Sequence, residues 1–117
     1  MIIRGADTLP EQVSHQIDLK KHVILSKGIV PGLLQCATAR LKSQEVIAPH
    51  VHVSMAEIFY IISGELCILL DRERCYLSSG DSVIILPGKL HGFECLVDCQ
   101  FYYFNIEDNS AIAGIKP

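Results

Sequence analysis

The chain has no tryptophan, no surplus of basic residues and no long uninterrupted apolar run. Its 117 residues carry a formal net charge of −3, so it lacks the basic face that nucleic-acid binding requires. No apolar run approaches the roughly 20 residues of a membrane-spanning helix. At the N-terminus a charge comes too early, and the apolar run is too short, for a signal peptide. We therefore expect a cytoplasmic protein with no nucleic-acid or membrane partner.

Paired cysteine motifs are also missing. The five cysteines are an odd number and contain no CxxC pair, which argues against a disulfide framework or a thiolate zinc site. We expect most of them to be buried apolar residues, although Cys67 and Cys75 could become neighbours across a hairpin. A phosphate-binding loop of the GxxxxGK[ST] type is absent as well.

Short apolar runs separated by turn residues dominate the sequence. Half of the residues are hydrophobic and a fifth are charged, as in one globular domain, which we expect to span residues 1–117. The pattern predicts an all-β fold, a small antiparallel barrel or sandwich. We expect strands at 22–26, 34–41, 46–52, 58–62, 66–70, 75–77, 82–86, 92–96 and 100–106, with a turn at 63–64. We expect a loop or short helical turn over 6–16 and a loosely held tail over 108–117, where Ile112 and Ile115 could dock on a partner.

A set of metal-binding residue types stands out from this background: His50, His52, Glu57 and His91. Alternate side chains of a strand point the same way, so His50 and His52 share a face. A hairpin turn over 53–56 would let Glu57 point back at the same spot. Three imidazoles and a carboxylate suit a divalent transition metal, with iron as the first expectation and manganese, nickel and zinc as alternatives. If the metal is octahedral, two positions stay open for a substrate and dioxygen, or for a bidentate substrate.

The spacing resembles the paired motifs of the cupin superfamily, in its small single-domain (type 2) form. The first motif runs from Gln44 through His50 to Gly64, and the second from Gly80 through the Pro87-Gly88 pair and His91 to Cys95. The two segments lie within residues 44–95, nearly half of the chain. The resemblance implies a jelly-roll barrel, or double-stranded β-helix, that holds a metal at His50, His52, Glu57 and His91.

Three positions depart from the family pattern. Gln44 stands where the first motif usually has glycine, Leu86 where the second usually has proline, and Cys95 where it usually ends in asparagine. None of the three is a metal ligand. The departures therefore bear on the loop that enters His50 and on the surroundings of Cys95, rather than on the donor set.

Strand alternation predicts a pocket around the metal. Counting from Glu57 and from His91, the inward residues are Phe59, Ile61, Phe93 and Cys95, which make a mostly apolar pocket for a small molecule. Cys95 either packs as a small apolar residue or places its thiol beside the metal. Tyr102 or Tyr103 is a candidate for the barrel mouth. Arg40 would bind a substrate carboxylate or phosphate if it points inward, and is an ordinary surface charge if it points outward.

The outward residues of the same strand predict a partner. Ile58, Tyr60 and Ile62 are too apolar for a solvated face, where polar residues normally alternate with apolar ones. We therefore expect a second copy of the chain to cover them. The resemblance to cupins supports a homodimer.

The resemblance leaves the activity open, because cupins include dioxygenases, sugar isomerases and epimerases, decarboxylases, storage proteins and sensor domains. Our first hypothesis is a mononuclear metal-dependent oxygenase that acts on a small molecule. The alternatives are a non-redox isomerase or lyase acting on a sugar-like substrate, and a non-catalytic barrel that binds or senses a small ligand. No catalytic acid or base beyond the ligands is recognisable, so no catalytic residue is assigned.

Overall fold

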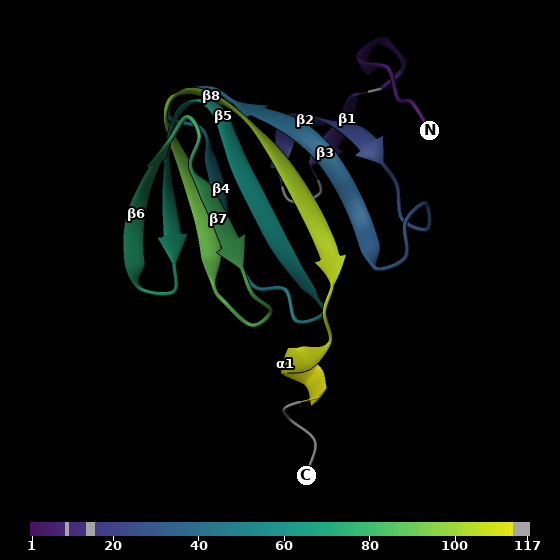
Figure 1. The fold of residues 1–117 in the computed structure, drawn as a ribbon. Coiled ribbons are helices and arrows are strands. Elements are labelled where there is room, and N and C mark those ends of the chain that lie inside the picture. The colour runs from purple at the N-terminus through teal and green to yellow at the C-terminus, as the bar shows by residue number, and fades with distance from the viewer. Residues whose placement is uncertain (9, 14–15, 114–117) are drawn as a thin grey trace.

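The structure is a computed structural model that describes residues 1–8, 10–13 and 16–113. It describes the side chains of these residues except at positions 11–20 and 113. A short 3-10 helix, Gly5–Asp7, precedes an eight-stranded sheet, and the short helix α1 (Ser110–Ala113) follows it (Figure 1). No helix in the described ranges is long and apolar enough to cross a membrane. The strands are β1 (Pro10–Val13), β2 (Gln16–Leu25), β3 (Leu33–Leu41), β4 (Val46–His50), β5 (Met55–Leu70), β6 (Glu73–Ser78), β7 (Ser82–Ile85) and β8 (His91–Glu107).

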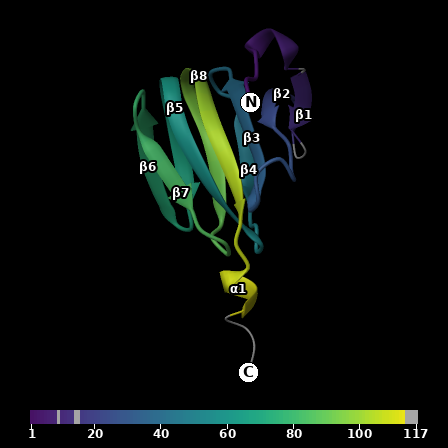
Figure 2. The ribbon, with the colours of Figure 1, turned by 45° about the vertical axis from the view of Figure 1, so that its right-hand side comes forward.

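Two long strands, β5 and β8, pair antiparallel along their whole length and bend together. The first half of β5 and the second half of β8 lie in one layer with β7, β3, β2 and β1. The other halves lie in a second layer with β6 and β4. Figures 1 and 2 show the layers facing each other below the bend. The antiparallel jelly-roll predicted from the sequence is confirmed.

The bend lies where the sequence predicts a turn. The register of β5 against β8 shifts three times between Ile61 and Leu66, and Gly64 has a φ of +87°. A Cβ atom on Gly64 would overlap the carbonyl oxygen of Asp98 and lie 2.7 Å from the Cβ of Cys99. The chain thus bulges without reversing, because β8 bends alongside it. The predicted strands 58–62 and 66–70 are therefore one strand, as are 92–96 and 100–106.

The two ends of the chain differ from the expectation in part. The segment expected as a loop or helical turn over 6–16 contains β1, which pairs with β2, although residues 9, 14 and 15 lie outside the described ones. At the other end, Ile112 in α1 is 42% exposed. Ile115 lies outside the described residues, so its proposed docking role stays a prediction.

The core fills the space between the layers. Phe59, Ile61, Phe93 and Cys95 are all 5% exposed or less, as the alternation predicts. Arg40 is exposed between buried neighbours and therefore points outward, which leaves it as a surface charge.

All five cysteines are free, and four of them are buried. Cys75 is the register partner of Ile68, while Cys67 faces Tyr76. Because neighbouring residues of a strand point to opposite faces, the thiols of Cys67 and Cys75 lie on opposite sides of the β5–β6 ribbon. The proximity considered from the sequence therefore produces no bond.

The bend supplies a stability test. Gly64→Ala combines a left-handed backbone conformation with the clash against Asp98, whereas Gly80→Ala has a similar φ, +91°, and nothing within 4 Å of the new Cβ. We expect Gly80→Ala to lower the free energy of unfolding by the ~1–3 kcal/mol of backbone strain alone, and Gly64→Ala to lower it by more. Urea unfolding of both variants measures the difference. Equal losses would contradict the close approach of β5 and β8.

Candidate metal centre

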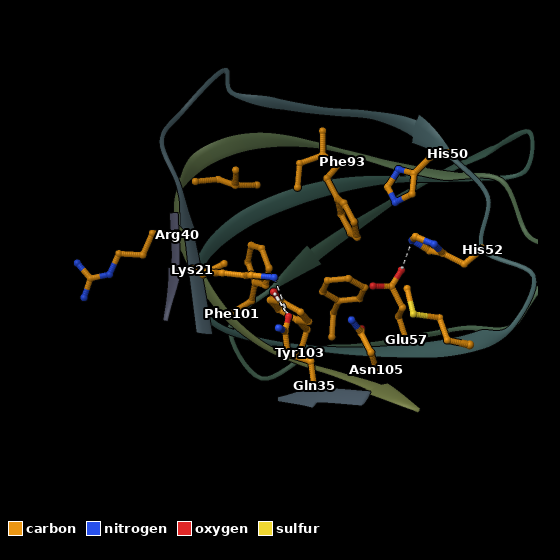
Figure 3. A pocket seen from close by; sticks show the side chains of 15 residues that line it. Lys21, Gln35, Arg40, His50, His52, Glu57, Phe93, Phe101, Tyr103 and Asn105 are labelled. Atoms are coloured by element: carbon orange, nitrogen blue, oxygen red, sulfur yellow. Dashed lines mark hydrogen bonds and ion pairs between the residues drawn. The ribbon is translucent and has the colours of Figure 1, made fainter. Parts of the chain in front are cut away.

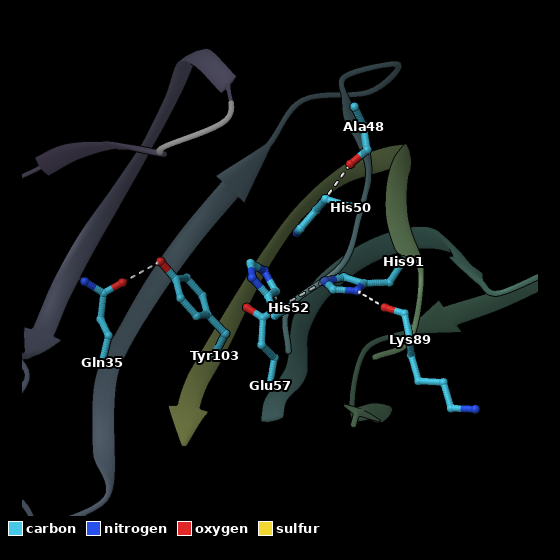
Figure 4. A network of polar contacts seen from close by, with 8 residues as sticks. All are labelled: Gln35, Ala48, His50, His52, Glu57, Lys89, His91 and Tyr103. Carbon is cyan, nitrogen blue, oxygen red and sulfur yellow. Dashed lines mark hydrogen bonds and ion pairs between the residues drawn. The ribbon is translucent and has the colours of Figure 1, made fainter. Parts of the chain in front are cut away.

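Four side chains with metal-binding atoms meet at one end of the barrel. His50 ends β4 and is the register partner of His91, which begins β8. Glu57 points in from β5, and His52 lies in the loop between β4 and β5. One nitrogen from each histidine and one oxygen of Glu57 all lie within 4.8 Å of one another. The structure thus brings together all four of the ligands suggested by the sequence (Figure 4).

His52 reaches the cluster by a different route from the one predicted. Strand β4 ends at His50, two residues earlier than expected, so strand alternation does not position His52. The amide of Gly88 donates a hydrogen bond of 2.7 Å to the carbonyl oxygen of His52. This bond ties the loop to the Pro87-Gly88 turn, and the His52 ring lies 4.8 Å from the ring of His50.

Two of the histidines are oriented as metal ligands usually are. The Nδ1 atom of His50 lies 2.8 Å from the carbonyl oxygen of Ala48, and that of His91 lies 2.9 Å from the carbonyl oxygen of Lys89. An Nδ1–H that donates to a backbone carbonyl fixes the tautomer and leaves the lone pair on Nε2. Nε2 of His91 faces Glu57. The donor set therefore fits a divalent metal in both chemistry and orientation.

Glu57 is the electrostatic centre of the cluster. Its Oε1 atom lies 2.9 Å from Nε2 of His91 and 3.3 Å from Nε2 of His52. Burial by itself lowers the pKa of His91, but the hydrogen bonds to Glu57 and to the Lys89 carbonyl outweigh it and raise that pKa above its usual value. Burial, with the neighbouring His50 and His91, lowers the pKa of His52 against the attraction of Glu57. The buried carboxylate thus calls for a positive partner, which a proton or a metal ion can supply.

A cavity of about 100 Å³ opens beside the cluster (Figure 3). Since ~10–15 Å³ of such volume is enough to hold one water molecule, the cavity has room for a compact molecule. Among the predicted pocket residues, Phe59 and Phe93 line it, with their ring centroids 4.8 Å apart. Ile61 and Cys95 belong to the core deeper in the barrel.

The thiol of Cys95 is engaged away from the metal cluster. Its Sγ lies 3.3 Å from Sγ of Cys99 and 3.1 Å from the carbonyl oxygen of Val97. Burial raises the pKa of Cys95, and burial followed by the contact with Cys95 raises the pKa of Cys99 to about 12. Both thiols are therefore protonated near neutral pH, and Cys95 acts as a small buried residue, the simpler of the two readings of the sequence.

Gln44 explains one departure from the family pattern. It stands where the first motif usually has glycine, and its φ is +74°, in the left-handed region that glycine adopts without strain. The backbone amide of Gln44 donates to the carbonyl oxygen of Cys95, and the backbone amide of Cys95 donates to the carbonyl oxygen of Glu45. These bonds hold the loop in place, with Gln44 in a left-handed conformation in spite of its side chain.

Sequence reasoning missed part of the cavity wall. Lys21, Gln35 and Asn105 line it, as does Tyr103, which was predicted only as one of two candidates for the barrel mouth. Gln35 and Asn105 are register partners on β3 and β8, and Glu57 is the partner of Asn105 on β5. Gln35 and Asn105 could have been found because they share a row with Glu57, but recognising that row requires knowledge of the strand register. Arg40 also borders the cavity, yet Figure 3 shows its side chain directed away from it.

Comparisons with known proteins agree with this architecture. The model of the family described as cupin domain matches residues 37–106, which is more than half of the chain. A search among curated proteins finds no match.

Solved structures share the fold over most of the chain. A predicted oxalate decarboxylase from Thermotoga maritima is 23% identical with a TM-score of 0.81, over 92% of this chain and 100% of that one. KdgF from Halomonas sp. is 18% identical with a TM-score of 0.75, over 94% and 96% of the two chains. An RmlC-like cupin from Shewanella frigidimarina is 18% identical with a TM-score of 0.75, over 93% and 92%. At these identities the likeness concerns the fold alone.

The cluster predicts where metal affinity resides. Loss of a residue that only hydrogen-bonds a metal ligand weakens metal binding ~10–100-fold. We expect His52→Ala to weaken it by more, because this change removes a donor atom. His22→Ala is the matched control, since His22 is exposed and lies outside the cluster. Elemental analysis and metal titration of both variants test this. Full metal stoichiometry and affinity in His52→Ala would exclude the cluster as the site.

Proposed function

Because this chain belongs to the cupin domain family, we propose that it is a metal-dependent enzyme acting on a small molecule, with oxygenation as its reaction. One observation carries the proposal: three imidazoles and a carboxylate converge on one point, and His50, His52 and Glu57 of this cluster line a cavity whose remaining wall includes several aromatic rings. A bound divalent metal supplies Lewis-acid activation and, if it is iron, redox chemistry with dioxygen. We further propose a cytoplasmic location, which the five free cysteines support because thiols stay reduced there.

The residues of the site have separate roles in this proposal. His50, His52, Glu57 and His91 hold the metal, and the Ala48 and Lys89 carbonyls orient two of the rings. Phe59 and Phe93 exclude water from the space beside the metal, which protects a reactive species from side reactions. The four side chains would hold the metal from one side of the cavity, and a substrate in the cavity would lie beside His50, His52 and Glu57.

A non-redox reaction is the second candidate, and the polar part of the cavity wall favours it. An isomerase or lyase acting on a sugar-like substrate needs groups that move protons and bind hydroxyls. Tyr103 and Lys21 carry O–H and N–H donors within hydrogen-bonding distance of Gln35 in the same cavity. A barrel that only binds or senses a small ligand is the third reading, and turnover distinguishes it from the other two.

Metal identity and oxygen uptake test the proposed reaction. After anaerobic reconstitution we expect about one equivalent of iron, and oxygen consumption with a substrate found among catechols, thiols and diketones. Glu57→Gln removes the carboxylate charge with little change in shape, so uptake should fall to background. The corresponding change at exposed Glu65, Glu65→Gln, is the control and should have no effect. Zinc or manganese without oxygen uptake, together with sugar turnover, would favour the second candidate, and absence of metal would contradict both.

We also propose a homodimer, on the basis of the outer face of β5 and its neighbours. Ile58 is the register partner of Phe104 on β8 and of Ile84 on β7, and Tyr60 is the partner of Tyr102. These outward residues form an apolar surface across three strands, with Tyr60 44% and Ile84 59% exposed. A second copy would cover this face, and a stable interface needs roughly 800 Å² from each partner.

A single charge on this face tests the dimer. We expect Tyr60→Glu to give a monomer in light scattering coupled to size-exclusion chromatography, because an unpaired carboxylate in a buried interface is strongly unfavourable. Tyr76→Glu is the control, since Tyr76 is 68% exposed on β6, in the other layer. A wild-type monomer at high concentration would contradict the proposal, as would a dimer that tolerates Tyr60→Glu.

A further inference from the structure

The cavity has a polar row that the metal cluster does not use. Gln35, Asn105 and Glu57 are register partners across β3, β8 and β5. Register partners point to the same face of a sheet, and all three residues line the cavity. Glu57 belongs to the metal cluster, so Gln35 and Asn105 extend its polar row away from the cluster.

Asn105 has an unmet hydrogen-bonding requirement. Its Oδ1 is buried and, among the atoms that the structure describes, is the one buried side-chain oxygen or nitrogen without a hydrogen-bond partner. Leaving such a group unpaired costs about 1–3 kcal/mol, so an unpaired amide in a cavity wall points to a ligand. An amide oxygen accepts hydrogen bonds, so it matches a hydroxyl or N–H group on that ligand.

Lys21 brings a positive charge to the same cavity. Its Nζ donates a hydrogen bond of 2.8 Å to Oε1 of Gln35, and the hydroxyl of Tyr103 donates to the same oxygen over 3.1 Å. Gln35 is neutral, and none of the ion pairs among the described side chains includes Lys21. An ammonium group has three N–H donors. Among the described side chains its hydrogen-bond partner is Gln35, so the ammonium is suited to an anionic ligand.

The charge balance of the cavity favours the same class of ligand. Glu57 is the one acidic residue among the described residues that line it, and its charge faces His52 and His91. Beside the polar row lies an apolar surface, since the Phe59 ring packs against Tyr103 at a centroid distance of 5.7 Å. The cavity thus offers a cation, a hydrogen-bond acceptor and an apolar wall within a small volume.

We propose that Lys21, held by Gln35, binds the carboxylate of a small organic acid, and that Asn105 accepts a hydrogen bond from a hydroxyl or N–H group of that acid. This proposal deepens the proposed function and rests on it for the reacting end of the substrate, which faces the metal cluster. The substrate class is then a compact carboxylic acid with a donor group, and neutral sugars are excluded as the preferred class.

The test compares acids with their neutral amides. The probes are benzoate, benzamide, 4-hydroxybenzoate and 4-hydroxybenzamide, titrated into metal-loaded and metal-stripped wild-type protein and followed by NMR chemical shifts. We expect each acid to bind at least tenfold more tightly than its amide, with and without metal. Lys21→Met should abolish this preference, and Lys21→Arg should retain it.

Two controls separate this subsite from general electrostatics and from the metal. Arg40→Met removes the same charge from a side chain that points away from the cavity, so the acid preference should persist. Asn105→Ala should weaken 4-hydroxybenzoate at least fivefold and leave benzoate unchanged, because benzoate has no donor for the amide. Thermal unfolding of each variant verifies that it is folded.

The outcomes distinguish the two proposals. An acid preference that needs Lys21 but survives metal removal supports the subsite, even if no metal-dependent turnover is ever found. Equal binding of acids and amides overturns the subsite and leaves the metal proposal intact. A preference that disappears with the metal, or one that Lys21→Met and Arg40→Met reduce equally, overturns it as well.

Discussion

Strands β5 and β8 pair antiparallel over the whole length of both, and they bend together where Gly64 passes the backbone of Asp98. This pairing is the constraint on which the site depends. At one end of the ribbon it aligns Glu57 with Asn105, and at the other it aligns Leu70 with His91. Only a ribbon folded back on itself brings Glu57 and His91 within 2.9 Å, because they lie far apart along the strands. The bend is therefore as necessary to the metal cluster as the ligands themselves.

The cluster balances a buried carboxylate against three imidazoles. Glu57 is 6% exposed and His91 is 1% exposed, so neither group is well solvated. A carboxylate without a counter-charge would be costly in such a place. Burial works against a charge on His91, yet its hydrogen bonds to Glu57 and to the Lys89 carbonyl raise its pKa, whereas burial lowers the pKa of His52. A divalent metal would supply the positive partner of Glu57 in place of a proton, so metal affinity would rise with pH as the imidazoles lose their protons.

Much of this could be predicted from the sequence, because the decisive signals are local. The H-x-H pair, Glu57 and the turn glycines are set by short spacings, and strand alternation places Phe59 and Phe93 inside. The structure of the ribbon could not be predicted in the same way. A Ser63-Gly64 pair is typical of a turn, and only the neighbouring strand makes it a bulge. The position of Lys21 depends on the register of β2 against β3, which no local pattern reveals.

The inward rows of the large layer grade from polar to apolar. Beyond the row of Gln35, Asn105 and Glu57 comes the row of Ala37, Tyr103 and Phe59, and then the row of Ala39, Phe101 and Ile61. Lys21 starts opposite Ala39, in the most apolar of these rows.

Burying an ammonium among alkyl and phenyl groups is unfavourable. The long side chain of Lys21 therefore extends toward the polar row, as lysine side chains do at apolar surfaces. Ala37 and Ala39 are small enough to leave that path open, and the amide of Gln35 receives the charge at 2.8 Å. The change from apolar to polar rows thus places the ammonium of Lys21 at the edge of the cavity beside the cluster.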